Sequence, residues 1–298
     1  MSQLKVPEIN SEELKPVDNN DARCAPGIEY KSGSCMDVEI LSALAHAYNK
    51  EYPNKKIELD DKWIVLNADK YKRYLVFNLK QRIDKPQREW ENMKFAKMVN
   101  KEIRKKLENS TFRPMGPQGK FEWLNTIQIE EVQKQYQNLK YEDYEFLGAV
   151  PIDFDLINNK FKNINFKEYV DKGKTKLGVV FNLDKHDEPG SHWVGLYMDL
   201  KKGQIYFFDS YGTTPEPEIQ AFMRKVSRYL ESTGMKPSDI DMRWNKVQHQ
   251  RKGSECGVYS INFILRMLRG DNFDDLCNKP VSDEKINRCR RKYFENTK

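Results

Sequence analysis

The spacing of apolar residues predicts a mainly helical region between residues 23 and 110. After the segment 34–37, which resembles a capping box, apolar residues recur every three or four positions. A second helix is predicted over residues 91–107, with strongly basic outer faces. The short apolar runs 63–66 and 74–77 fit either strands or buried helix. This part of the chain is therefore predicted to form a helical N-terminal domain.

From residue 121 the pattern changes to short apolar runs that are typical of strands. Three of them follow one another at residues 177–183, 192–200 and 204–209, and Lys202-Gly203 predicts a tight hairpin between the last two. Further elements are predicted around them: a strand or buried loop at 146–151, a strand at 241–247, and helices at 123–136, 215–230 and 256–269. A group of strands with flanking helices favours an α+β fold.

Composition adds limits to this outline. We expect a flexible polar arm over 1–22, the helical domain over 23–110, a Pro- and Gly-containing linker over 111–120 and a second domain over 121–298. The polar start has no secretory signal, and no apolar run reaches the roughly 18 to 20 residues of a membrane span. A net charge of +6 over 298 residues is too small to indicate a nucleic-acid partner by itself.

The five cysteines do not suggest a disulfide framework. Their number is odd, and no CxxC pair supports a zinc site. We therefore expect free thiols and ask which of them is built to react. Cys35 lies near a predicted helix start, but its nearest histidine, His46, would be roughly 16 Å away along that helix. Cys24, Cys277 and Cys289 have no chemical partner in their local sequence.

Cys256 has the surroundings of a nucleophile. It lies where a helix is predicted to begin, between the small residues Ser254 and Gly257, which would let a substrate backbone approach. A helix N-terminus stabilises negative charge on sulfur and on an oxyanion. The Cys256 N–H has no helical acceptor and can donate to that oxyanion, and the Gln250 side-chain amide can provide a second donor.

A cysteine nucleophile also needs a base, and His192 is the best placed of the four histidines. It opens a predicted strand next to Trp193, and the following strand ends at Asp209. In the predicted hairpin, His192 and Asp209 lie at the same open end, so Asp209 can orient the imidazole towards Cys256. By contrast, His186 falls in a charged loop and His249 in a polar run.

The four candidate residues follow one another in the order His192, Asp209, Gln250, Cys256, with 17 residues from His to Asp and 6 from Gln to Cys. In this order and spacing the chain resembles the ubiquitin-like protease family of cysteine peptidases. That family includes the SUMO-specific proteases and the adenovirus maturation protease. One departure is Glu255, where SUMO-specific proteases usually carry Asp. The resemblance implies a papain-like core with a central mixed sheet, no cofactor or metal, and a polypeptide substrate.

Several other segments resemble the form of the family found in African swine fever virus and other large cytoplasmic DNA viruses. These segments are residues 31–36, 123–125, 146–148 and 151–154. The resemblance implies a helical arm domain before the protease core and cleavage of viral structural polyproteins after Gly-Gly-like pairs during virion maturation. It places the enzyme in the host cytoplasm, at the viral factory, and in the virion. Trp193, beside the base, and Gly257 are the expected substrate-binding residues.

Two alternatives remain open. A protease that deconjugates SUMO or another ubiquitin-like modifier would use the same four residues, so the site cannot separate it from a polyprotein protease. A basic nucleic-acid or particle-binding protein with a degenerate protease fold would rely on the run 101–106. The complete set of four site residues argues against such decay, and DNA contact at this run also fits an accessory property of an active enzyme.

Overall fold

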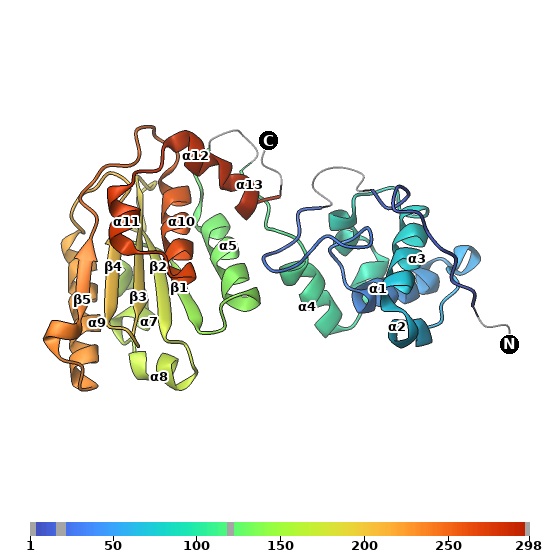
Figure 1. Ribbon diagram of the computed structural model, residues 1–298, viewed down its shortest axis with the longest axis horizontal. Coiled ribbons are helices and arrows are strands. Elements are labelled where there is room, and N and C mark those ends of the chain that lie inside the picture. Colours follow the sequence, from blue (N-terminus) through green and yellow to red (C-terminus); the bar gives the residue numbers. More distant parts are fainter. Residues whose placement is uncertain (1–3, 16–21, 118–121, 296–298) are drawn as a thin grey trace. The chain divides into compact units, whose positions relative to one another are not determined.

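The computed structural model describes residues 4–15, 22–117 and 122–295. The chain forms two compact units, Met1–Arg113 and Pro114–Lys298, and each has its own hydrophobic core (Figure 1). No helix within these described ranges is long and apolar enough to cross a membrane.

The N-terminal unit is helical, as its apolar spacing predicts. Its elements are α1 (Val38–Glu51), η1 (Pro53–Lys55), α2 (Lys62–Leu66), α3 (Ala68–Lys80), η2 (Gln87–Asn92), η3 (Phe95–Met98) and α4 (Lys101–Ser110). The two undecided apolar runs fall in α2 and α3, so both are helical. At the centre of the core, Leu41, Leu44, Leu75 and Trp90 are completely buried.

Two helix starts differ from the prediction because asparagine and aspartate side chains cap these helices. The helix expected over 91–107 begins only at Lys101, where Asn100 Oδ1 accepts a hydrogen bond from the N–H of Ile103 at 2.8 Å. In α1 the cap is Asp37, so the capping box expected at 34–37 is wrong. Short polar side chains favour a helix start over its interior, since they bond to the unpaired N–H groups there.

The polar arm expected over 1–22 contributes to the N-terminal core where it is described. Val6 and Leu14 are both buried in this core. Leu4 and Ile9 pack against it as well. These few apolar residues have neither helical nor strand spacing, so the pattern analysis could not detect their burial.

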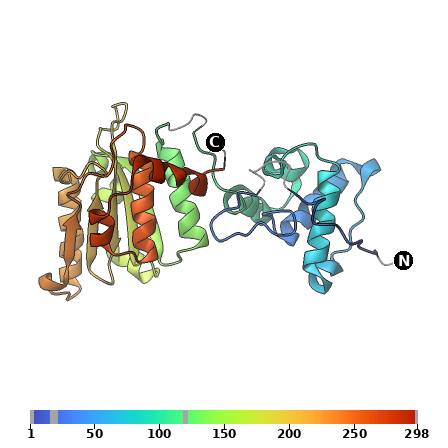
Figure 2. The same ribbon diagram turned by 45° about the horizontal axis from the view of Figure 1, so that its top comes forward.

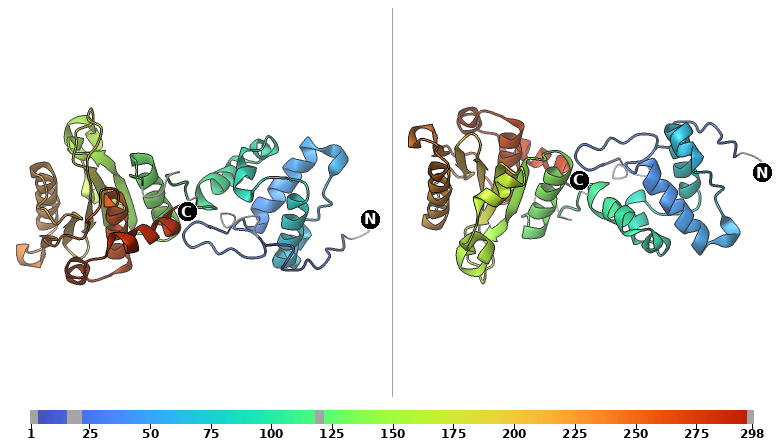
Figure 3. Two further views of the ribbon diagram at one scale, coloured as in Figure 1. Left: turned by 90° about the horizontal axis from the view of Figure 1, so that it is seen from above. Right: turned by 90° about the horizontal axis from the view of Figure 1, so that it is seen from below.

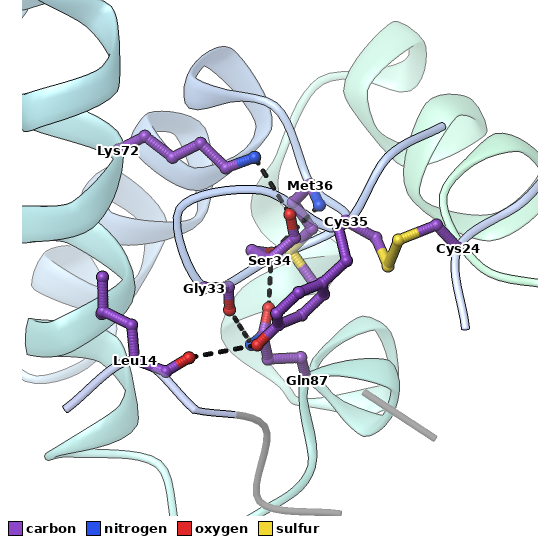
Figure 4. Close-up of a disulfide and its surroundings, with 9 residues drawn as sticks. Leu14, Cys24, Gly33, Ser34, Cys35, Met36, Lys72 and Gln87 are labelled. Atoms are coloured by element: carbon purple, nitrogen blue, oxygen red, sulfur yellow. Dashed lines mark hydrogen bonds between the residues drawn. A yellow bond between two sulfur atoms is a disulfide. The ribbon is translucent and has the colours of Figure 1, made fainter. Parts of the chain in front are cut away.

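Cys24 and Cys35 form a disulfide, which corrects the expectation that all five cysteines are thiols. Their Cα atoms are 5.3 Å apart. Figure 4 shows the reason: Cys35 follows a tight turn held by Gln87, whose side-chain Nε2 donates to the carbonyl of Gly33 at 2.7 Å. The turn brings Cys35 beside Cys24. Counting cysteines cannot reveal such a pair, because long-range contacts determine their proximity.

The C-terminal unit contains a five-stranded mixed sheet. Its strands lie in chain order: β1 (Tyr144–Pro151), β2 (Lys176–Asn182), β3 (Trp193–Asp199), β4 (Gln204–Phe208) and β5 (Asp241–Trp244). The pairs β1–β2 and β4–β5 are parallel, and β2–β3–β4 is antiparallel. The α+β class expected from the sequence is confirmed.

Helices cover both faces of this sheet, as the turned views in Figures 2 and 3 show. On one face lie α5 (Thr126–Leu139), α10 (Cys256–Arg269), α11 (Phe273–Asn278), α12 (Asp283–Arg288) and α13 (Arg290–Tyr293). On the other lie α6 (Phe154–Ile157), α7 (Asn159–Lys162), α8 (Phe166–Asp171) and α9 (Pro217–Ser232), and η4 (Pro237–Asp239) precedes β5. Side chains of β3 alternate between the two cores: Tyr197 joins the first, and Leu196 the second.

Candidate active site

The hairpin of β3 and β4 brings His192 and Asp209 together. Gly195 pairs with Phe208, so the residues just before β3 and just after β4 lie at the same end of the sheet. There, His192 Nε2 is 2.5 Å from Asp209 Oδ1, and both side chains are buried. The bond to Nε2 leaves Nδ1 as the ring nitrogen that can serve Cys256.

Asp209 is fixed by a dense set of hydrogen bonds. Its backbone N–H donates to Asn245 Oδ1 at 2.8 Å, and Asn245 Nδ2 donates to its carbonyl at 2.7 Å. Its carboxylate accepts from the N–H groups of Tyr211 and Thr213 and from the Thr213 hydroxyl. Burial alone would raise the pKa of Asp209, but the bond and charge of His192 and these donors lower it below its usual value. Asp209 therefore stays ionised beside the imidazole.

Cys256 is the first residue of α10, so the helix N-terminus faces its thiol. The hydroxyl of Ser260 donates to the carbonyls of Cys256 (3.0 Å) and Trp193 (3.1 Å), which joins this helix to β3 next to His192. Burial lowers the pKa of His192, but hydrogen bonds to Asp209 and Cys256 and the negative charges of both raise it to about 9. A protonated imidazole beside the sulfur favours a thiolate nucleophile.

The Gln250 side chain is held in a fully buried position near the nucleophile. Its Oε1 accepts from the hydroxyl of Ser210 at 2.7 Å, and its Nε2 donates to the carbonyl of Lys252 at 2.6 Å. The second amide hydrogen has only a long contact of 3.5 Å with the hydroxyl of Tyr211. That hydrogen is therefore available to a substrate oxyanion, together with the N–H of Cys256.

Trp193, the residue after His192, lines a cleft of about 450 Å³. Its indole N–H donates to the carbonyl of Leu124 at 2.8 Å, which fixes the ring against the cleft wall. Trp123, 48% exposed, lines the same cleft. Gly257 packs against Leu124: a Cβ there would lie 3.1 Å from the Leu124 Cβ. The absence of a side chain at Gly257 thus serves close packing, and its contact with substrate stays a prediction.

The structure links His192 directly to Asp209 and Cys256. Gln250 is joined to this group through Ser210 and Tyr211, and the catalytic roles of the four residues stay a prediction. The other histidines bond elsewhere: His46 to Asp61, His186 to Asp153, and His249 to the carbonyl of Cys277. Burial raises the pKa of Cys277 to about 12, so this thiol is unreactive. The basic run 101–106 forms most of α4, and nucleic-acid contact there stays a prediction.

Three residues of the site had no role in the sequence interpretation. Tyr211 stacks on the His192 ring, Asn245 clamps the backbone of Asp209, and Trp123 faces the cleft. The position of Tyr211, two residues after Asp209, was a usable signal for it. Asn245 left no signal, because its contact depends on the parallel pairing of β4 with β5.

Comparisons with known proteins agree with this geometry. Residues 163–298 match the family described as Ulp1 protease family, C-terminal catalytic domain. A putative thiol protease of Acanthamoeba polyphaga mimivirus is 35% identical over 286 residues, which cover 92% of this chain and 93% of the relative. A cysteine protease of African swine fever virus is 24% identical over 296 residues, covering 94% of this chain and 98% of the relative.

The fold is shared as well. The crystal structure of the African swine fever virus protease superposes with a TM-score of 0.62 at 20% identity, covering 95% of this chain and 98% of that one. Both viral relatives therefore extend across the N-terminal unit as well as the catalytic unit. With a hydrogen-bonded His192–Asp209 pair beside Cys256, and 35% identity to a thiol protease over nearly its whole length, the chain belongs to the Ulp1 protease family of cysteine proteases.

Proposed function

We propose that this cysteine protease cleaves viral structural polyproteins after Gly-Gly-like pairs during virion maturation. The observation that carries the proposal is the cleft lined by Trp123, Leu124 and Trp193. It reaches the site through two of these residues: Trp193 follows His192 in the chain, and Leu124 packs against Gly257, next to Cys256. Both viral relatives match over more than nine-tenths of this chain, which supports a viral setting. On this proposal the enzyme acts in the host cytoplasm and in the particle.

The first half of the reaction transfers an acyl group to sulfur. The thiolate of Cys256 attacks the scissile carbonyl carbon, a C–S bond forms, and the carbonyl electron pair moves onto oxygen. Gln250 and the Cys256 N–H donate to this oxyanion, where one such donor contributes about 3 to 4 kcal/mol. As the tetrahedral adduct collapses, His192 Nδ1 gives its proton to the leaving amine and the C–N bond breaks.

The second half releases the acyl group to water. Neutral His192 takes a proton from a water molecule, whose oxygen attacks the thioester carbon. The C–S bond then breaks, which regenerates the Cys256 thiolate and the protonated imidazole. Throughout, Asp209 holds the imidazole through its bond of 2.5 Å and stabilises its positive form.

The cleft favours small residues next to the scissile bond. The ring of Trp193 is buried and its N–H is anchored to Leu124, so the ring cannot easily move aside for a substrate side chain. The cleft lining also includes Ile157, Asp184 and Glu188. On this proposal an extended substrate places glycine beside Trp193 and larger residues along the rest of the cleft.

The decisive test offers two kinds of substrate side by side. Structural polyproteins of the viruses that carry the relatives, and ubiquitin-like modifiers with a C-terminal extension, are incubated with the wild-type chain and with Cys256→Ala. New N-termini are then sequenced. We expect cleavage after small-residue pairs in the polyproteins, and none by Cys256→Ala. The matched control is Cys289→Ala. Cys289 is a free thiol between α12 and α13, next to Asn262 of α10, and its removal should leave activity unchanged.

Two outcomes would contradict the proposal. Cleavage of the modifier fusions alone would identify a deconjugating protease that uses the same four residues. Full activity of Cys256→Ala on any substrate would exclude the nucleophile and with it the mechanism.

A further inference from the structure

Asp283 connects the helix that carries Cys256 to the loop that carries Gln250. Its Oδ2 accepts from the backbone N–H groups of Arg251 and Lys252, each at 3.0 Å. Its Oδ1 accepts from the hydroxyl of Tyr259 at 3.1 Å. Only 3% of Asp283 is exposed, so this is a buried carboxylate with three donors.

Asp283 holds the loop by its backbone, whereas the Lys252 side chain makes only a surface pair with Glu284. Arg251 and Lys252 are exposed, and residues 251–254 lie outside any helix or strand. The Lys252 backbone has a direct link to the oxyanion site: its N–H is held by Asp283, and its carbonyl accepts from Gln250 Nε2 at 2.6 Å. A shift of this backbone would therefore turn the amide of Gln250.

The other end of the connection is anchored in α10. Tyr259 lies three residues after Cys256, about one turn along the same helix. Its hydroxyl is shared between Asp283 and the carbonyl of Val281, at 2.6 Å from the latter. The distance between the two oxyanion donors is thus set through one carboxylate.

We propose that Asp283 is a positioning residue that fixes the Gln250 amide relative to the Cys256 N–H and so completes the oxyanion site. The inference rests on the proposed acyl-transfer mechanism and adds a residue to it. Asp283 does not touch substrate. Its effect appears only when negative charge develops on the carbonyl oxygen, because it acts through the orientation of a donor.

This role predicts a specific kinetic pattern. Removing one oxyanion donor costs roughly 100- to 1,000-fold in kcat, which sets an upper limit for misplacing it. We expect Asp283→Ala to lower kcat about 10- to 100-fold and to change KM by less than about threefold, because ground-state binding does not use the oxyanion donors. Asp283→Asn should recover most of this loss, since its amide oxygen can still accept from both loop N–H groups.

The experiment compares three probes on the full chain: a fluorogenic peptide ending in Gly-Gly, the matching peptide aldehyde and iodoacetamide. The aldehyde forms a tetrahedral adduct whose oxygen occupies the oxyanion site, whereas alkylation by iodoacetamide forms no oxyanion. We expect Asp283→Ala to weaken aldehyde binding about tenfold or more and to change alkylation of Cys256 less than about twofold. In the double variant with Gln250→Ala, Asp283→Ala should weaken aldehyde binding by less than about threefold beyond Gln250→Ala alone, because its effect passes through Gln250.

The matched control is Glu284→Ala, one residue along the same helix. Glu284 pairs with the side chain of Lys252 at 2.8 Å but does not hold the loop backbone, so kcat should stay within about twofold of wild type. Equal aldehyde affinity in Asp283→Ala and wild type, or a full additional loss in the double variant, would overturn the positioning role. If Asp283→Ala does not fold, Asp283→Ser carries the same test, because its side chain remains polar but is too short to reach the loop.

Failure of the proposed acyl-transfer mechanism would look different. In that case neither iodoacetamide at Cys256 nor the aldehyde would block the wild-type chain, and no variant comparison would be needed to see it. Wild-type inhibition by both probes with no effect of Asp283→Ala would contradict only the positioning role.

Discussion

The phenol ring of Tyr211 lies nearly parallel to the imidazole of His192, with ring centroids 4.6 Å apart and planes tilted by 23°. Tyr211 is 39% exposed, so it covers one face of the catalytic base at the surface of the site. Because the stack opposes rotation of the imidazole, it adds to the orientation given by Asp209. The base is thus held at its edge by a carboxylate and on its face by an aromatic ring.

This stack predicts different effects for two substitutions at Tyr211. Tyr211→Ala should lower kcat/KM about 3- to 10-fold, since an aromatic pair contributes about 0.5 to 1.5 kcal/mol. Tyr211→Phe keeps the ring and should stay within about twofold of wild type. Steady-state kinetics on a Gly-Gly peptide measure both. Equal losses in the two variants would assign the effect to the hydroxyl, which lies 3.5 Å from Gln250 Nε2.

The pH profile should reveal the charge of His192. Its pKa is raised to about 9, so the imidazole stays protonated through neutral pH and loses its proton as the pH passes about 9. We therefore expect kcat/KM to fall on the alkaline side near that pH. In Asp209→Asn the negative charge that stabilises the imidazolium is lost, so the pKa falls and the alkaline limb must move to lower pH.

The control for this shift is a carboxylate that does not face the base. Asp153→Asn removes an acidic group bonded to His186, and it should leave the alkaline limb in place. An alkaline limb that does not move in Asp209→Asn would show that His192 is not the group that titrates.

Much of the catalytic centre could be predicted from sequence because its signals are local. Alternating strands placed His192 and Asp209 at one end of a hairpin, and the observed β3 and β4 differ from the predicted strands by one residue at each shifted boundary. Helical spacing placed Cys256 at the start of α10, which begins and ends where the prediction put it. The order of the residues in the chain then matched a known family.

Other parts depend on contacts between distant segments, and no local pattern encodes them. Asp283 follows Gln250 by 33 positions and reaches its loop only because α12 packs beside α10. Cys24 and Cys35 pair because a turn held by Gln87 brings them together. In both cases the residue type is ordinary, and only the tertiary fold gives it a role.

The Cys24–Cys35 disulfide should stabilise the N-terminal unit. Closing a loop of about 12 residues restricts the unfolded chain, which corresponds to about 2 to 3 kcal/mol of unfolding free energy. Calorimetry of the full chain should therefore show a lower unfolding temperature for this unit after reduction, or in Cys24→Ser with Cys35→Ser.

The same treatment provides its own control. Reductant should have no further effect on the double variant, and the transition of the C-terminal unit should stay in place, since its cysteines Cys256, Cys277 and Cys289 are free. An unchanged unfolding temperature of the N-terminal unit in the reduced wild type would contradict a stabilising disulfide.

Trp193 and Trp123 should affect substrate choice in different ways, although both line the same cleft. Trp193 is buried and anchored beside the base, so we expect it to restrict the residue next to the scissile bond. Trp193→Phe removes the indole N–H and part of the ring, and should reduce the preference for Gly-Gly over Ala-Ala about tenfold, because one methyl group in a tight pocket is worth about 1 to 3 kcal/mol.

Trp123 is half exposed, so we expect it to offer an apolar surface to the substrate without restricting the residue at the scissile bond. Trp123→Ala should therefore raise KM for Gly-Gly and Ala-Ala peptides by similar factors and leave their ratio unchanged, since it removes binding that both substrates share. The ratio of kcat/KM for the two peptides, measured in both variants, separates the roles. A ratio that changes in Trp123→Ala but not in Trp193→Phe would assign the glycine selectivity to Trp123.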